Sequence, residues 1–273
     1  MSLAYLPERG VLEVAGPDRV AFLQGLVSND VSKIPPGEAA WSALLTPQGK
    51  WLADFFVIAS GDTLLLDAER EQVPALVQRL SRFRLRSKVT LRDASGDWHV
   101  HTAWGAPPAA GLVVADPRLA EAGWRVLTPA PLAGDATAED YDRHRLALGL
   151  PDGSKDMDSE KSVLLEAGFD ELHGVSWSKG CYMGQELTAR TRYRGLVKRR
   201  LVPVAVEGPL PARGTILTDA AGAEAGEMRS GRDSLGLALL RLDALPRAPL
   251  RAGDATLTPR IPAWMHLPAR EEA

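Results

Sequence analysis

The only cysteine of the chain, Cys181, lies in a motif whose residue types suit thiol chemistry. The motif reads KGCYMGQE over residues 179–186. Two glycines free the backbone to turn, and good helix formers at 185–190 should place Cys181 just before a helix N-terminus. That position, close to Lys179, favours the thiolate, the form that acts as nucleophile or metal ligand. The alternative is a small buried residue that only packs.

The composition is that of a globular protein in a reducing compartment. The 273 residues are 45% hydrophobic and 25% charged, with a net charge of −3 and one cysteine, which argues against a disulfide scaffold. Residues 1–10 contain no apolar run, and the longest uncharged stretch, 98–115, holds two histidines and two prolines. We therefore expect a cytoplasmic protein without a signal peptide, a membrane helix or a membrane partner.

The periodicity of apolar residues predicts a mixed region followed by a barrel. The predicted strands of the first region cover 11–14, 39–46, 51–59, 63–66 and 82–91, and the predicted helices cover 16–27, 69–80 and 138–148. In 82–91, alternation would turn Phe83, Leu85, Val89 and Leu91 toward a core. From 201 onward, short apolar segments separated by Gly, Pro and Asp predict a small antiparallel barrel with strands at 201–206, 214–218, 224–228, 235–240 and 255–259.

A family resemblance extends over nearly the whole chain. The pattern KGCYxGQExxxR over 179–190 resembles the signature of the YgfZ family of folate-binding proteins, relatives of the glycine-cleavage T-protein that act in iron–sulfur cluster maturation. Residues 16–30, and 44–50 with Asp54, are similar to the T-protein-like N-terminus. Residues 150–162 match least well.

The resemblance implies a fold and a domain division. The expected class is α+β, a T-protein-like ring of subdomains with mixed or antiparallel sheets and helices, plus a C-terminal antiparallel β-barrel. The expected domains are a folate-binding region, 1–199, and a barrel, 200–273. Within the first, about 46–120 would be inserted to give two interleaved subdomains.

The resemblance also implies that a cavity binds tetrahydrofolate or a derivative. Such a site needs flat apolar walls and a few oriented polar groups. A carboxylate can accept two hydrogen bonds from an aminopyrimidine edge. The candidate folate-binding residues are Glu166, Trp177, Tyr182, Gln185, Glu186 and Arg190. For the aromatic residues, packing in the core stays the alternative.

Two runs of cationic residues contain no acid. The first consists of Arg79, Arg82, Arg84, Arg86 and Lys88, and the second of Arg190, Arg192, Arg194, Lys198, Arg199 and Arg200. They could hold an anionic folate tail or dock an acidic partner protein, or they could be solvated faces. Little aromatic interleaving beyond Tyr193 accompanies these cations, so we expect a protein or folate partner rather than a nucleic acid.

Counting thiols limits what Cys181 can do with an iron–sulfur cluster. A cluster takes about four thiolate ligands, and this chain offers one. Cys181 would therefore share a transient cluster with a partner, and Lys179 is the second candidate catalytic residue. We predict a tetrahydrofolate-binding protein that assembles or repairs iron–sulfur clusters, with reduced folate and iron–sulfur assembly or recipient proteins as partners.

Two other functions remain open. One is an aminomethyltransferase of the glycine-cleavage type, whose pattern has a catalytic aspartate seven residues after the end of a strand. In this chain the matching strand ends at Asp67, and the residue seven positions later is Pro74, which cannot exchange a proton. A shift of the alignment would place Glu71 there instead. The cysteine motif is not part of the transferase pattern, which favours the assembly function. The second alternative is a folate-binding scaffold with no essential thiol. His99 and His101 could be metal ligands but lack a third ligand nearby in the sequence.

Overall fold

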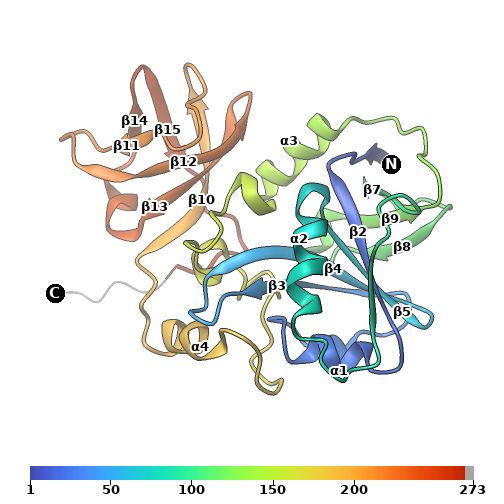
Figure 1. Cartoon of the computed structure of the whole chain (residues 1–273). Coiled ribbons are helices and arrows are strands. Elements are labelled where there is room, and N and C mark those ends of the chain that lie inside the picture. Colours follow the sequence, from blue (N-terminus) through green and yellow to red (C-terminus); the bar gives the residue numbers. More distant parts are fainter. Residues whose placement is uncertain (268–273) are drawn as a thin grey trace. The chain divides into compact units, whose positions relative to one another are not determined.

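The computed structural model describes residues 1–267, which fold into two compact units (Figure 1). Unit one consists of Met1–Tyr141 and His173–Gln185, and unit two of Asp142–Leu172 and the described residues from Glu186 onward. The chain thus passes between the units three times. The domain division expected from the sequence stays a prediction.

Two antiparallel sheets form the frame of unit one. The five-stranded sheet has the order β3-β4-β5-β2-β6, with β3 Ala39–Leu45, β4 Trp51–Ser60, β5 Thr63–Glu69, β2 Arg9–Ala15 and β6 Thr90–Asp93. The four-stranded sheet has the order β1-β7-β9-β8, with β1 Ser2–Tyr5, β7 His99–Trp104, β9 Trp124–Thr128 and β8 Leu112–Ala115. Most of the strands predicted before residue 70 are therefore confirmed.

Two helices pack on the five-stranded sheet. They are α1, Arg19–Gln24, and α2, Val73–Ser81. Pro74 stands in the first turn of α2, where its missing N–H has no helical partner to lose. Leu76 and Leu80 of α2 join Leu12 and Leu66 of the sheet in one buried core, where each such side chain contributes about 1.5–3 kcal/mol.

The strand predicted over 82–91 is wrong for most of its length. Residues 82–87 form successive turns, and only Thr90–Asp93 pairs with β2. Phe83 is 42% exposed and Leu85 is 90% exposed, so neither faces a core. Leu85 also has a φ of +40°, outside the range of a strand. Alternation of apolar and charged residues does not by itself distinguish a strand from a loop.

A buried ion cluster joins the two sheets of unit one. Asp67 of β5 is fully buried, and it accepts a hydrogen bond from Nε of Arg9 (2.7 Å) and another from Nε of Arg125 on β9 (2.8 Å). The guanidinium carbon of Arg125 lies 4.7 Å from the ring centroid of Phe56. One carboxylate thus holds an arginine from each sheet.

Unit two contains the closed barrel, with the order β10-β13-β12-β11-β14-β15. Its strands are β10 Arg199–Glu207, β11 Ile216–Thr218, β12 Glu224–Arg232, β13 Leu235–Arg241, β14 Leu250–Ala252 and β15 Ala255–Pro259. Val204, Met228, Leu240 and Leu257 are among its buried core residues. The expected α+β class and antiparallel barrel are confirmed. The short strand β14 was not predicted.

Two further helices each contain a point at which the chain passes from unit one to unit two. They are α3, Ala138–Leu148, which has the predicted bounds, and α4, Gln185–Tyr193. The short 3₁₀ helices are η1 Val31–Lys33, η2 Arg70–Gln72, η3 Ala120–Ala122, η4 Gly153–Lys155, η5 Leu164–Ala167 and η6 Leu242–Arg247. Among residues 1–267, no helix has the length and apolar character that crossing a bilayer requires.

Candidate functional site: the cysteine loop

The segment 173–185, here called the cysteine loop, is fixed to the stretch between α1 and β3. The side-chain amide of Asn29 donates to the carbonyl of His173 (2.6 Å), and the hydroxyl of Ser28 donates to the carbonyl of Gly174 (2.7 Å). In return, the backbone N–H of Ser176 donates to the carbonyl of Ser28 (3.0 Å). These bonds hold the start of the loop in place within unit one.

Lys179 is a buried residue that anchors the middle of the loop. It is only 7% exposed, and its ammonium donates to the carbonyls of Val27 (2.8 Å) and Asn29 (2.6 Å). Its Nζ also lies 5.2 Å from the ring centroid of Tyr182, which is a cation–π distance. Burial lowers the pKa of Lys179 to about 8, although the charge of Asp30 acts in the opposite direction.

The two glycines of the motif differ in the space that surrounds them. Gly184 has a φ of +82°, and a Cβ there would lie 2.6 Å from the carbonyl oxygen of Thr46 and 3.0 Å from Cα of Gly49. At Gly180, no atom lies within 4 Å of the position of an added Cβ. Gly184 is therefore needed for a close approach to the β3–β4 turn, whereas Gly180 lies in open space.

Cys181 is exposed, although the two residues that follow it pack inward. Tyr182 is 6% exposed, and Met183 packs against the core. The alternative that Cys181 is a buried packing residue is thus wrong. The helix α4 begins four residues after Cys181, as predicted, and the side chain of Gln185 accepts a hydrogen bond from the N–H of Tyr182 (3.3 Å).

Ser28 and Asn29, which anchor the start of the loop, were not among the site residues selected from the sequence. Ser28, Asn29 and Asp30 form a polar run directly after α1, and that run is the signal that could have pointed to them. Burial by itself would raise the pKa of Asp30, but hydrogen bonds from Ser32 and Gln24 and the contact with Lys33 lower it to about 2. Asp30 therefore remains charged at neutral pH, where it interacts electrostatically with Lys179.

Replacing Lys179 by methionine is expected to change how stability depends on pH. The pKa of Lys179 is about 8 in the folded protein against an ordinary 10.5, so the unfolded chain binds more protons between these pH values. The free energy of unfolding of the wild type should consequently rise from about pH 8 to about pH 10.5. Urea unfolding of both proteins across this range measures the effect. Parallel curves for the two proteins would contradict it.

The predicted site residues fall in both units. Trp177, Lys179, Cys181, Tyr182 and Gln185 belong to unit one, whereas Glu166, Glu186 and Arg190 belong to unit two. Trp177 is half-buried, and Glu186 and Arg190 are exposed on α4. Their roles in binding a cofactor stay predictions.

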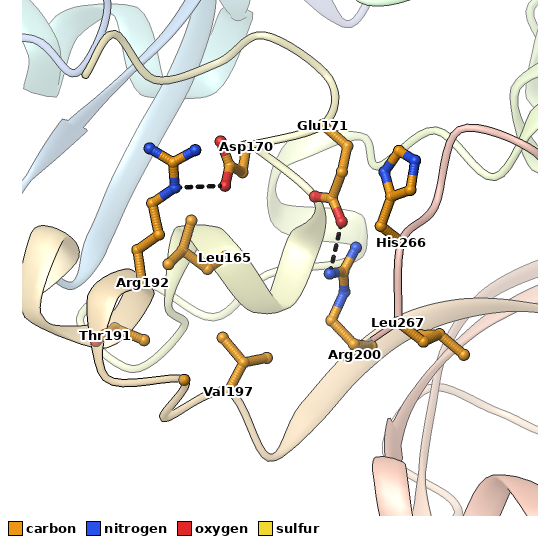
Figure 2. A pocket seen from close by; sticks show the side chains of 10 residues that line it. Leu165, Asp170, Glu171, Thr191, Arg192, Val197, Arg200, His266 and Leu267 are labelled. Carbon is orange, nitrogen blue, oxygen red and sulfur yellow. Dashed lines mark hydrogen bonds and ion pairs between the residues drawn. The ribbon is translucent and has the colours of Figure 1, made fainter. Parts of the chain in front are cut away.

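Unit two has a pocket of about 500 Å³ between η5, the end of α4 and β10 (Figure 2). Two ion pairs line it, Asp170–Arg192 (3.0 Å) and Glu171–Arg200 (2.8 Å), with His266 beside them. Among the described residues, Nε and Nη2 of the buried Arg200 have no hydrogen-bond partner. These two donors lie on the same edge of the guanidinium, which can donate two parallel hydrogen bonds to a carboxylate. None of the predicted folate-binding residues lines this pocket.

Acids from the segment 166–171 neutralise half of the second cationic run. Arg199 pairs with Glu166 (3.2 Å) in a neighbouring pocket of about 730 Å³, in addition to the pairs of Arg192 and Arg200. The run contains no acid in the sequence, but the fold brings three to it. Glu166, a predicted folate ligand, thus already has a cationic partner.

The side chains of the described residues form no recognisable metal site. Within residues 1–267, no cluster of three or more His, Cys, Asp or Glu is placed to bind a metal ion. Nε2 of the buried His101 accepts a hydrogen bond from the N–H of Leu132 (2.9 Å), and His99 contacts the hydroxyl of Tyr5 (3.2 Å). The two histidines therefore have structural partners.

Comparison with known proteins places these units in a family. Residues 8–116 match the GCVT N-terminal domain, and residues 198–267 match the CAF17 C-terminal beta-barrel domain. The human protein named iron-sulfur cluster assembly factor IBA57, mitochondrial, is 33% identical over 303 residues, covering 95% of this chain and 84% of the relative. The chain belongs to the IBA57 family. The mouse IBA57 protein is 32% identical, with coverage of 95% and 84%.

A fungal IBA57 homologue from Mycosarcoma maydis is 40% identical over 227 residues. This match covers 74% of the chain and 56% of that relative, so the chain spans little more than half of the fungal protein's length. The relatives from human, mouse and Mycosarcoma maydis are each named mitochondrial. The expectation of a cytoplasmic protein is contradicted by these names, which point to mitochondria.

The solved structure of glycine cleavage system aminomethyltransferase T from Bartonella henselae has the same fold. It superposes with a TM-score of 0.75 at 14% identity, covering 96% of this chain and 85% of that one. The T-protein-like fold expected from the sequence is therefore confirmed. In place of the YgfZ family itself, the comparisons show IBA57, with a GCVT-like N-terminal domain and a C-terminal barrel.

Proposed function

We propose that this IBA57-family protein acts in the assembly or repair of iron–sulfur clusters on other proteins, with Cys181 as its reactive group. The observation that carries the proposal is the exposed thiol of Cys181 on a loop that Lys179 and Gly184 hold in one conformation. Such a loop presents a ligand without burying it. The printed names of the human and mouse relatives support the same function.

The chemistry assigned to Cys181 is ligand exchange on a cluster that is cargo. The thiol gives its proton to solvent, and the thiolate displaces one cysteine thiolate of a partner from iron, while other cysteines of that partner keep the remaining positions. The displaced thiolate takes up a proton from solvent. One thiol in the chain makes sharing necessary. Lys179 contributes by positioning the loop, because its ammonium is already engaged with two backbone carbonyls.

We further propose that tetrahydrofolate or a derivative binds this protein. The GCVT-like domain supports the proposal. Trp177, Glu186 and Arg190 are the candidates with side chains at least partly open to a ligand. Tyr182 is a buried residue of the loop and would contribute to the wall of the site. Gln185 and Glu166 would contribute polar groups.

The structure offers little support for a transferase that uses an acid near Pro74. Both carboxylate oxygens of Asp67 are bound by arginines. Pro74 and Glu71 are exposed at the start of α2. The match to an aminomethyltransferase, at 14% identity, concerns the fold alone.

Rescue of a [4Fe–4S] enzyme in cells that lack their own IBA57-family protein tests the proposal. Wild type should restore the enzyme's activity, while Cys181→Ser should leave it at background at matched expression. Ser178→Ala, also exposed on the loop, is the control and should rescue fully. Equal rescue by Cys181→Ser would remove the thiol from the function and favour a folate-binding scaffold. Absence of rescue by wild type would contradict the assembly function.

A further inference from the structure

We propose that residues 82–88, here called the cationic loop, are a docking surface for an acidic partner protein, and this partner is the iron–sulfur protein of the proposed function. The loop belongs to unit one and connects α2 to β6. Its sequence is RFRLRSK, with four cations and no acid. The cysteine motif lies in another segment and does not explain this concentration of positive charge.

The charges of the cationic loop have no counterions within the described part of the chain. Arg82, Arg84, Arg86 and Lys88 are all exposed, and their side chains form no ion pair among residues 1–267. The second cationic run differs, since Arg192, Arg199 and Arg200 each have an acid partner. A concentration of unpaired positive charge on a chain of net charge −3 attracts an acidic surface and accelerates its association.

The cationic loop is ordered rather than loose. Turn hydrogen bonds join Arg84 N–H to the carbonyl of Ser81 (3.2 Å) and Ser87 N–H to the carbonyl of Arg84 (2.7 Å). At its base, the carboxylate of Asp18 accepts from the N–H of Lys88 (2.7 Å). Gly16 packs so closely there that an added Cβ would lie 2.2 Å from the carbonyl oxygen of Lys88.

The apex of the cationic loop displays apolar side chains in a conformation that folding alone does not favour. Leu85 is 90% exposed at a φ of +40°, and Phe83 is 42% exposed. A left-handed conformation is unfavourable for a leucine because of its Cβ, and Leu85 gains no burial in a core that would compensate for it. A leucine held outward in this way fits a role in contacting a partner.

A protein is the occupant that uses all of these features. Arginines and exposed apolar side chains together are typical of protein interfaces, and a fixed, strained apex provides a shape that a complementary surface can recognise. A nucleic-acid backbone would neutralise the arginines but leave Leu85 in water. A fluid bilayer gains nothing from a single fixed backbone conformation.

Photo-crosslinking in cells tests this surface. A benzophenone amino acid replaces Leu85 in one variant and Ile216, an exposed residue of the barrel, in the control. We expect position 85 to yield an adduct with an iron–sulfur assembly or recipient protein that mass spectrometry identifies and whose surface is acidic. Arg84→Glu with Arg86→Glu should lower the adduct at least tenfold. An adduct that is absent, equally strong at 216, insensitive to charge reversal, or formed with lipid or RNA would overturn the proposal.

Two further variants separate docking from thiol chemistry and from stability. Cys181→Ser should keep the adduct at position 85, because docking does not require the thiol; if it does so while rescue fails, the two steps are distinct. Leu85→Gly should retain or increase the unfolding midpoint, since glycine accepts this φ, yet it should lower rescue severalfold. A lower midpoint with unchanged rescue would assign Leu85 a structural role and overturn the proposal.

Discussion

Asp67→Asn is expected to lower the free energy of unfolding by about 3–5 kcal/mol, the usual consequence of removing one partner from a buried ion pair. Asp67 is fully buried, and its carboxylate neutralises Arg9 from its own sheet and Arg125 from the four-stranded sheet. The amide would remove the negative charge that these two buried guanidinium groups share. Urea unfolding followed by tryptophan fluorescence measures the loss, because Trp41 and Trp51 are buried in the same unit.

Asp62→Asn is the matched control for this experiment. Asp62 is fully exposed, in a turn of unit one, 3.8 Å from Arg19. Exposed pairs contribute less than about 1 kcal/mol, so this variant should unfold like the wild type. If Asp67→Asn were equally mild, the buried arginines would have to find other acceptors, and the proposed joining of the sheets by Asp67 would be wrong.

Gly184→Ala is expected to reduce rescue of the [4Fe–4S] enzyme to the level of Cys181→Ser, although the thiol is still present. Alanine at φ +82° costs about 1–2 kcal/mol. Its Cβ would also meet the Thr46 carbonyl at 2.6 Å and the Cα of Gly49 at 3.0 Å, and backbone atoms cannot move aside as a flexible side chain can. The loop must therefore lift away from the β3–β4 turn, which displaces Cys181.

Gly180→Ala supplies the control within the same motif. Its Cβ would meet nothing within 4 Å, and the residue is exposed, so rescue and the rate at which Cys181 reacts with a thiol reagent should stay near wild type. The same reagent should react with Gly184→Ala at a rate changed severalfold. Full rescue by Gly184→Ala would show that the conformation of the loop does not matter to the function.

Local sequence signals predicted much of the fold correctly. The alternating strands before residue 70, the helix at 138–148 and the spacing of turn residues after 201 each act within a few neighbouring residues, and the structure contains these elements. The alternation in 82–91 misled because a strand also needs a paired neighbour, which residues 82–87 lack.

The sequence by itself predicted that the one thiol, which lies between glycines beside a lysine and is followed by a helix, is the reactive group of the chain. Only the tertiary structure decided what the neighbours of Cys181 do. It buried the ammonium of Lys179 against two carbonyls more than 140 residues away, and it left no space for a side chain at Gly184 while leaving open space at Gly180. It also gave acid partners to half of the second cationic run, whereas the cationic loop forms no ion pair with the residues that the structure describes. These outcomes depend on contacts between distant segments, and local residue patterns carry no information about which segments will meet.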